Sequence, residues 1–229
     1  MTPITKSAES QRRSAADSAE IGPLRKVQNR ERRMSCVGEG GLQTFLETYF
    51  DGIYYDEWGP KQLKLIESLE KVMLEGGRKA IAMPRGEGKT SISEGACFWA
   101  VLTGLRKYVM LVGATQDDAR ETIYNFKISL ESNDLLDADF PEVCQPARAL
   151  EGKAQRCASQ TLEGTRTRIK WTSEQIILPT VEEYVLEKAD VPLEHHGCRA
   201  IFRTSGITGA ARGFNLNTEQ GKKLRPDVV

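Results

Sequence analysis

Residues 82–90 of this chain read Ala-Met-Pro-Arg-Gly-Glu-Gly-Lys-Thr, and this stretch decides the fold. It follows an apolar run at 78–83 that is typical of a short buried strand, and it opens a helical pattern over roughly residues 89–104. A Gly-Lys-Thr between a strand and a helix is the context of a phosphate-binding loop. Small residues let the backbone amides turn toward phosphate oxygens, and the helix adds the partial positive charge of its N-terminus.

The residues of this loop have distinct expected roles. Lys89 supplies a positive charge to the β- and γ-phosphates, and Thr90 supplies a hydroxyl to Mg²⁺. Arg85 has two interpretations: its guanidinium stabilises the transferred γ-phosphoryl group, or it is a surface loop arginine. Met83 departs from the standard pattern, which has glycine there. We expect the whole loop to contact ATP and Mg²⁺, through Pro84, Arg85, Gly86, Glu87, Gly88, Lys89 and Thr90.

Two helical patterns precede the loop. Apolar residues recur at helical spacing over 42–50, and Pro60 stands at the start of a second helix that Gly76 and Gly77 end. Near this start, the amide of Gln62 both donates and accepts hydrogen bonds, so Gln62, with Trp58 beside it, is a candidate contact for an adenine edge. The alternative is a solvated helix N-terminus.

Strands and helices alternate after the loop. Residues 108–112 form an apolar strand pattern and 116–130 a helical one, which predicts a parallel sheet with covering helices. Short strands follow at 168–171, 175–178 and 199–204, the first two as a possible hairpin. Residues 228 and 229 look like the start of a further strand. We predict the α/β class: a P-loop NTPase with a mostly parallel sheet covered by helices, incomplete at its C-terminal edge.

Composition excludes several classes of protein. The 229 residues carry 32 Lys plus Arg against 32 Asp plus Glu, which excludes a uniformly basic nucleic-acid binder but not a local basic patch. Five cysteines without a C-x-x-C pair argue against a disulfide framework or a zinc ribbon. We interpret His195, His196 and Cys198 as loop residues. No apolar run is long enough to cross a bilayer, so no membrane partner is expected.

Basic residues gather near both ends of the chain. The first 35 residues hold eight basic residues and four acids, so we interpret residues 1–38 as a flexible arm that is solvated or contacts DNA or a partner protein. Residues 39–229 form the predicted ATPase domain. The stretch from residue 199 onward has six basic residues and two acids, and its candidate DNA contacts are Arg212, Lys222 and Lys223, with a solvated surface as the alternative.

Several segments in order resemble the large subunit of phage terminases, the DNA-packaging motors of tailed bacteriophages. The resemblance covers roughly residues 40–229. It includes the loop with an arginine inside it, and the order and spacing of the pieces are more specific than the loop alone. The segments are 58–62, 82–90, 99–104, 108–114, 139–144, 150–152, 206–209, 212–213 and 225–227.

The resemblance implies an ATPase that couples hydrolysis to the packaging of double-stranded viral DNA. It also implies a homo-oligomeric ring, a portal protein and a small terminase subunit as partners, in the cytoplasm of the infected bacterial host. In that family the strand near 225–227 ends in the Walker B acids and a nuclease domain follows. This sequence stops at Val229 before both, so we expect ATP binding, little or no hydrolysis by the chain alone, and marginal stability. The alternatives are a catalytically incomplete nucleotide- or DNA-binding fragment and a helicase-like P-loop ATPase.

Overall fold

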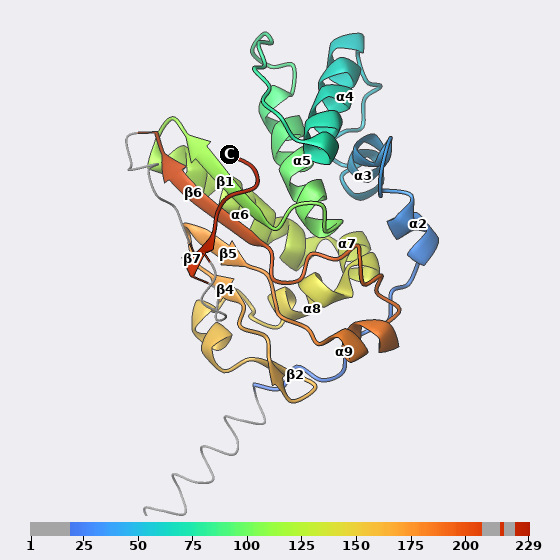
Figure 1. The fold of residues 1–229 in the computed structure, drawn as a ribbon, viewed down its shortest axis with the longest axis vertical. Coiled ribbons are helices and arrows are strands. Elements are labelled where there is room, and N and C mark those ends of the chain that lie inside the picture. Colours follow the sequence, from blue (N-terminus) through green and yellow to red (C-terminus); the bar gives the residue numbers. More distant parts are fainter. Residues whose placement is uncertain (1–18, 208–215, 218–222) are drawn as a thin grey trace, which may run out of the picture.

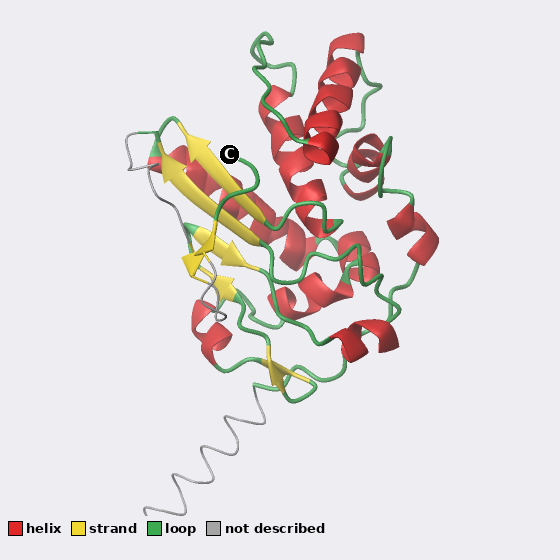
Figure 2. Cartoon of the chain, in the orientation of Figure 1, coloured by secondary structure: helices red, strands yellow, loops and turns green. Residues whose placement is uncertain are grey.

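The protein is a mixed α/β structure, seen here in a computed structural model that describes residues 19–207, 216–217 and 223–229 (Figure 1). Figure 2 shows the small main sheet with one helix behind it and most of the other helices to one side. Among the described residues, no helix is both long enough and apolar enough to span a lipid bilayer. The helical elements are α2 (Arg30–Met34), α3 (Gly41–Tyr49), α4 (Pro60–Glu75), α5 (Lys89–Leu102), α6 (Gln116–Ser132), α7 (Asp134–Asp139), α8 (Pro141–Arg148), the 3₁₀ turn η1 (Ala154–Ala158) and α9 (Glu183–Lys188).

The main sheet is mixed rather than mostly parallel. Its strand order is β1-β6-β5-β4, and only the β1–β6 pairing is parallel, with Tyr108 opposite Ile201 and Gly113 opposite Gly206. β4 and β5 form the expected hairpin, and a tight hairpin is necessarily antiparallel. The strands are β1 (Tyr108–Gly113), β4 (Lys170–Trp171), β5 (Gln175–Ile177) and β6 (Ile201–Gly206), with two small ribbons made by β2 (Thr161–Leu162) with β3 (Thr165–Arg166) and by β7 (Leu216–Asn217) with β8 (Lys223–Leu224).

The strand predicted at 78–83 does not form. Residues 76–84 have no regular secondary structure, and Arg78, Lys79 and Ala80 are exposed. The reason is the lack of a partner, because the edge of β1 is approached by the C-terminal residues instead. Val228 forms a parallel bridge with Val109, and Met110 N–H donates to the Val228 carbonyl at 2.8 Å. The expectation that residue 228 begins a strand therefore agrees with its position at this sheet edge.

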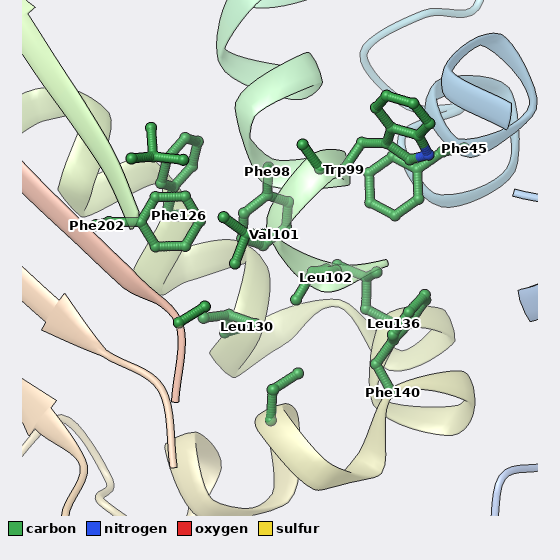
Figure 3. Close-up of a cluster of buried hydrophobic side chains, with 14 of the residues drawn as sticks. Phe45, Phe98, Trp99, Val101, Leu102, Phe126, Leu130, Leu136, Phe140 and Phe202 are labelled. Carbon is green, nitrogen blue, oxygen red and sulfur yellow. The ribbon is translucent and has the colours of Figure 1, made fainter. Parts of the chain in front are cut away.

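Aromatic side chains from three elements form the centre of the core. Phe98 of α5 stacks on Phe126 of α6 with ring centroids 4.9 Å apart, and Phe126 meets Phe202 of β6 at 4.8 Å (Figure 3). All three rings are buried, as is the second half of α5 from Phe98 to Leu102. The second half of helix α5 is therefore held in the core, while the predicted loop leads into its first turn.

The N-terminal segment is packed on the domain, so the prediction of a flexible arm is wrong for residues 19–38. Leu24 and Val27 are buried in a second apolar cluster with α9, and α2 lies against α7 and α8. Residues 1–18 lie outside the described residues. Three basic side chains of the segment pair with acids of α7 and α8, and of these only Arg33 is buried: Arg25 with Asp137, Arg32 with Asp139 and Arg33 with Glu142.

The pair formed by Arg33 and Glu142 is fully buried. The two Nη atoms of Arg33 donate to the two Glu142 carboxylate oxygens at 3.0 and 2.7 Å, and also to the backbone carbonyls of Asp139 and His195, both at 2.7 Å. The guanidinium lies 4.4 Å from the centre of the Phe140 ring. One side chain therefore joins the N-terminal segment, the α7–α8 turn and the loop before β6.

Replacing Glu142 with alanine should strongly destabilise the fold, because it leaves Arg33 buried without a counter-charge. We expect the free energy of unfolding, measured by urea denaturation, to fall by about 3 kcal/mol or more. The matched control is Asp190→Asn, since Arg30 and Asp190 form a half-exposed pair of the kind that contributes about 0–1 kcal/mol. Equal losses in the two variants would contradict the assigned importance of the buried pair.

Stability should also fall in mild acid because of His196. Burial, assisted by the charge of Lys107, lowers the pKa of His196 from 6.5 to about 4. Between these two values the unfolded chain binds the proton and the folded chain does not, so the free energy of unfolding decreases as pH drops from 6.5 toward 4. His196→Asn should flatten this part of a pH series of thermal melts. His195→Asn is the control, and the hypothesis fails if both variants keep the wild-type slope.

Candidate phosphate-binding site

The loop at 84–88 turns sharply into α5, as the sequence predicts. Gly86 and Gly88 have φ of +88° and +77°, values that L side chains rarely adopt, and Gly88 is the N-cap of α5. No side chain caps this helix end. In the part of the chain that the structure describes, the N–H groups of residues 88–91 donate no hydrogen bond. Four backbone donors are therefore free at the N-terminus of a 14-residue helix.

Two cationic side chains of the loop are also available. The exposed Arg85 guanidinium and the half-buried Lys89 ammonium make no hydrogen bond or ion pair with any other described residue, while Thr90 is exposed. Residues 83–91, Glu87 aside, line a concavity of about 460 Å³. Free amides, a helix N-terminus and unpaired cations around one hollow are the chemistry that phosphate groups require.

Helix α4 braces the loop from one side. Gln62 Oε1 accepts from Gly59 N–H at 2.9 Å, and Gln62 Nε2 donates to the Glu87 carbonyl at 3.4 Å. Lys61 Nζ meets the Glu87 carboxylate at 2.7 Å. The structure therefore brings Gln62 to the loop through Nε2, while Oε1 caps its own helix. Each of these atoms has a second donor or acceptor position, which is what an adenine contact would use.

Trp58 is directed toward other neighbours. Its indole Nε1 donates to Glu47 at 2.7 Å, and its ring lies 5.1 Å from that of Tyr54. These contacts fix the indole against the segment before α4. The structure thus gives Trp58 a packing role in the segment that leads into the bracing helix.

A second cavity beside Thr90 contains acidic residues that the sequence analysis did not identify. It has a volume of about 580 Å³ and lies where α5 begins, β1 ends and α6 begins. Its acids are Glu94, one helical turn after Thr90, and Asp118 and Glu121 of α6. The four-residue spacing from Thr90 to Glu94 places both side chains on one face of a helix, so the sequence could have indicated Glu94. The acids of α6 could be found only from the tertiary packing.

The structure describes only part of the expected DNA-contact and metal sites. Arg212 and Lys222, two of the candidate DNA contacts, lie outside the described residues. Lys223 begins β8, in a ribbon with Leu216–Asn217. Among the described side chains, no three His, Cys, Asp or Glu residues are placed to hold a metal ion. Mg²⁺ usually keeps several waters and takes one or two protein ligands together with substrate phosphates, so a single hydroxyl such as that of Thr90 is compatible with this role.

Comparison with known proteins gives no further guide to this site, because the chain matches no family model, no curated protein and no solved structure.

Alanine at Gly88 should strain the loop, whereas alanine at Gly59 should not. Both glycines are N-caps of long helices, but Gly88 has φ +77° and Gly59 has φ −69°. We expect Gly88→Ala to lower the free energy of unfolding by about 1 kcal/mol more than Gly59→Ala, because of the cost of a left-handed conformation. Urea denaturation of the two variants measures the difference. Equal losses would mean that the loop does not hold the positive φ that exposes its amides.

Proposed function

We propose that residues 84–91 bind the triphosphate of ATP with Mg²⁺. The observation that carries the proposal is the set of unpaired donors around one hollow: the N–H groups of 88–91 together with Lys89 and Arg85. Positive φ at Gly86 and Gly88 creates this arrangement, and the buried second half of α5 holds it in place. The free energy of binding therefore does not have to order the helix that supplies the donors.

Each residue has a definite task in this proposal. Lys89 neutralises charge on the terminal phosphates, Arg85 approaches the γ-phosphate from the opposite end of the loop, and the Thr90 hydroxyl ligates Mg²⁺. The metal neutralises charge on the phosphate oxygens. Gln62 and Lys61 hold the loop at Glu87, and Gln62 together with Trp58 is the proposed region for the base.

We further propose, from the resemblance of residues 40–229, that the chain is the ATP-binding part of a terminase large subunit. In that role it works in the cytoplasm of an infected bacterium, as a member of a homo-oligomeric ring at the portal protein. The ring moves double-stranded DNA with the help of a small terminase subunit. Arg212, Lys222 and Lys223 are the proposed contacts with DNA phosphates, which such movement requires in a sequence-independent form.

Slow hydrolysis fits the acids beside the loop. Asp118 accepts from Thr115 N–H at 3.0 Å as part of a helix cap, and Glu94 accepts from the Thr122 hydroxyl at 2.8 Å. One oxygen of each carboxylate is thus engaged in a structural hydrogen bond, which restricts the orientation of the group. The second candidate function is a nucleotide- or DNA-binding chain with incomplete catalytic machinery.

Calorimetric titration with Mg-ATP tests the binding proposal. We expect wild-type protein to bind, Lys89→Ala to bind at least about tenfold more weakly, and Lys64→Ala to match wild type. Lys64 is a suitable control because it is an exposed lysine on the neighbouring helix α4. Binding that is unchanged in Lys89→Ala would overturn the assignment of the loop.

Phosphate release measured on the same samples separates the two candidate functions. Release that depends on Lys89 and rises with double-stranded DNA supports a packaging ATPase. Stimulation by single strands would instead favour the helicase-like alternative. Nucleotide binding without release supports the catalytically incomplete protein.

A further inference from the structure

A separate aromatic cavity lies further along α5. It has a volume of about 300 Å³, within the range of small-molecule sites, and lies between α3, the segment 50–54, α5 and α6. Four aromatic side chains line it: Phe50, Tyr54, Phe98 and Phe126. Two of them, Phe98 and Phe126, which are labelled in Figure 3, stack on each other with ring centroids 4.9 Å apart. Ile53 and Ile128, which are 60% and 42% exposed, also line this cavity.

Glu94 contributes a carboxylate to the lining of this aromatic cavity. Its Oε1 accepts from the Thr122 hydroxyl at 2.8 Å, while Oε2 has no hydrogen bond among the described residues. No lysine or arginine in the described chain forms an ion pair with Glu94. A partly buried carboxylate is normally balanced by a nearby cation, so this cavity lacks a positive charge.

The cavity is distinct from the proposed ATP site. Ser91 lies at the helix N-terminus and borders both hollows, but Phe98 is seven residues further along α5, about 10 Å by the helical rise. Arg85 and Lys89, the cationic residues of the proposed ATP site, do not line the aromatic cavity.

We propose that this cavity binds an organic cation, an ammonium or guanidinium group on an apolar stem, with Glu94 as its counter-charge. The aromatic side chains cover its apolar stem, and the free Oε2 accepts its N–H. Gly95 lets Leu46 of α3 pack closely against α5 at the cavity wall, since a Cβ there would meet Leu46 Cδ2 at 2.5 Å. The cation belongs either to a small amine or to a lysine or arginine side chain of a partner protein.

The surroundings of Glu94 give this site a definite pH dependence. Burial raises the pKa of Glu94, the nearby charge of Glu121 raises it further, and the hydrogen bond from Thr122 opposes this shift. The other titratable groups that sense Glu94 are Tyr54 and Cys97, whose pKa values are both raised to about 12, so they stay neutral near pH 7. Binding of an amine that stays charged should therefore weaken as pH falls and Glu94 becomes protonated.

Calorimetric titration with 2-phenylethylamine tests the proposal, with 2-phenylethanol as its neutral isostere. We expect the amine to bind wild-type protein, about tenfold more weakly in Glu94→Gln, and the alcohol to bind both proteins equally and weakly. Glutamine retains an acceptor for Thr122, which protects the fold. The control Glu67→Gln makes the same change at an exposed residue of α4 and should leave amine binding unchanged.

The outcomes are separable. Three results would overturn the proposal. The amine could bind wild-type protein no better than the alcohol does, it could bind Glu94→Gln as tightly as wild type, or its affinity for wild type could stay constant as the pH is lowered. A third titrant, acetyl-phenylalanyl-arginine amide, distinguishes the sources: tighter binding than the amine points to a protein side chain, and weaker binding to a free amine. Because Lys89→Ala leaves this cavity intact, failure of ATP binding does not decide the result.

Discussion

The buried contact between Arg33 and Glu142 is the interaction on which the rest of the architecture depends. It fixes the N-terminal segment to α7 and α8, and these helices pack against α6, which supports β1 and β6. An ion pair without solvent contributes little net free energy compared with apolar packing, but it tolerates only one arrangement of its partners. The pair therefore selects the position of the segments around the core rather than supplying most of the stability.

The sequence predicted elements whose signal is local. The pattern at 60–75, the loop into α5, the strand at 108–112 and the helix at 116–130 all agree with the structure to within about two residues. Their periodicity and caps depend on neighbours along the chain, as in the capping box of Thr115 and Asp118. Residues 78–83 have strand composition but no adjacent strand to pair with. Likewise, the charges of residues 25–33 predicted a solvated arm, whereas tertiary contacts pair its four arginines with acids and bury Arg33.

The residues of the candidate site also fall into two groups: those that a local motif predicts and those that only tertiary packing brings to the site. Gly86, Gly88, Lys89 and Thr90 could be identified from the sequence because one short motif fixes both conformation and chemistry. The acids near Thr90 could not, since Asp118 and Glu121 reach the cavity only through the packing of α6 on the sheet. The free carboxylate oxygen of Glu94 is likewise a property of its surroundings, because the sequence shows a glutamate but not the lack of a cation beside it.

The unpaired segment at 76–84 has a consequence for the energetics of any anion bound by the loop. This segment leads directly into Arg85 without regular secondary structure and contacts the core through Ile81 and Met83, in contrast to the buried helix on the other side of the loop. A ligand held between the two must restrict the backbone of one side only. Each residue so ordered costs about 1–2 kcal/mol in conformational entropy, which opposes a favourable enthalpy of phosphate contacts. The affinity of the loop therefore depends on the entropy of the segment before it as well as on the charges within it.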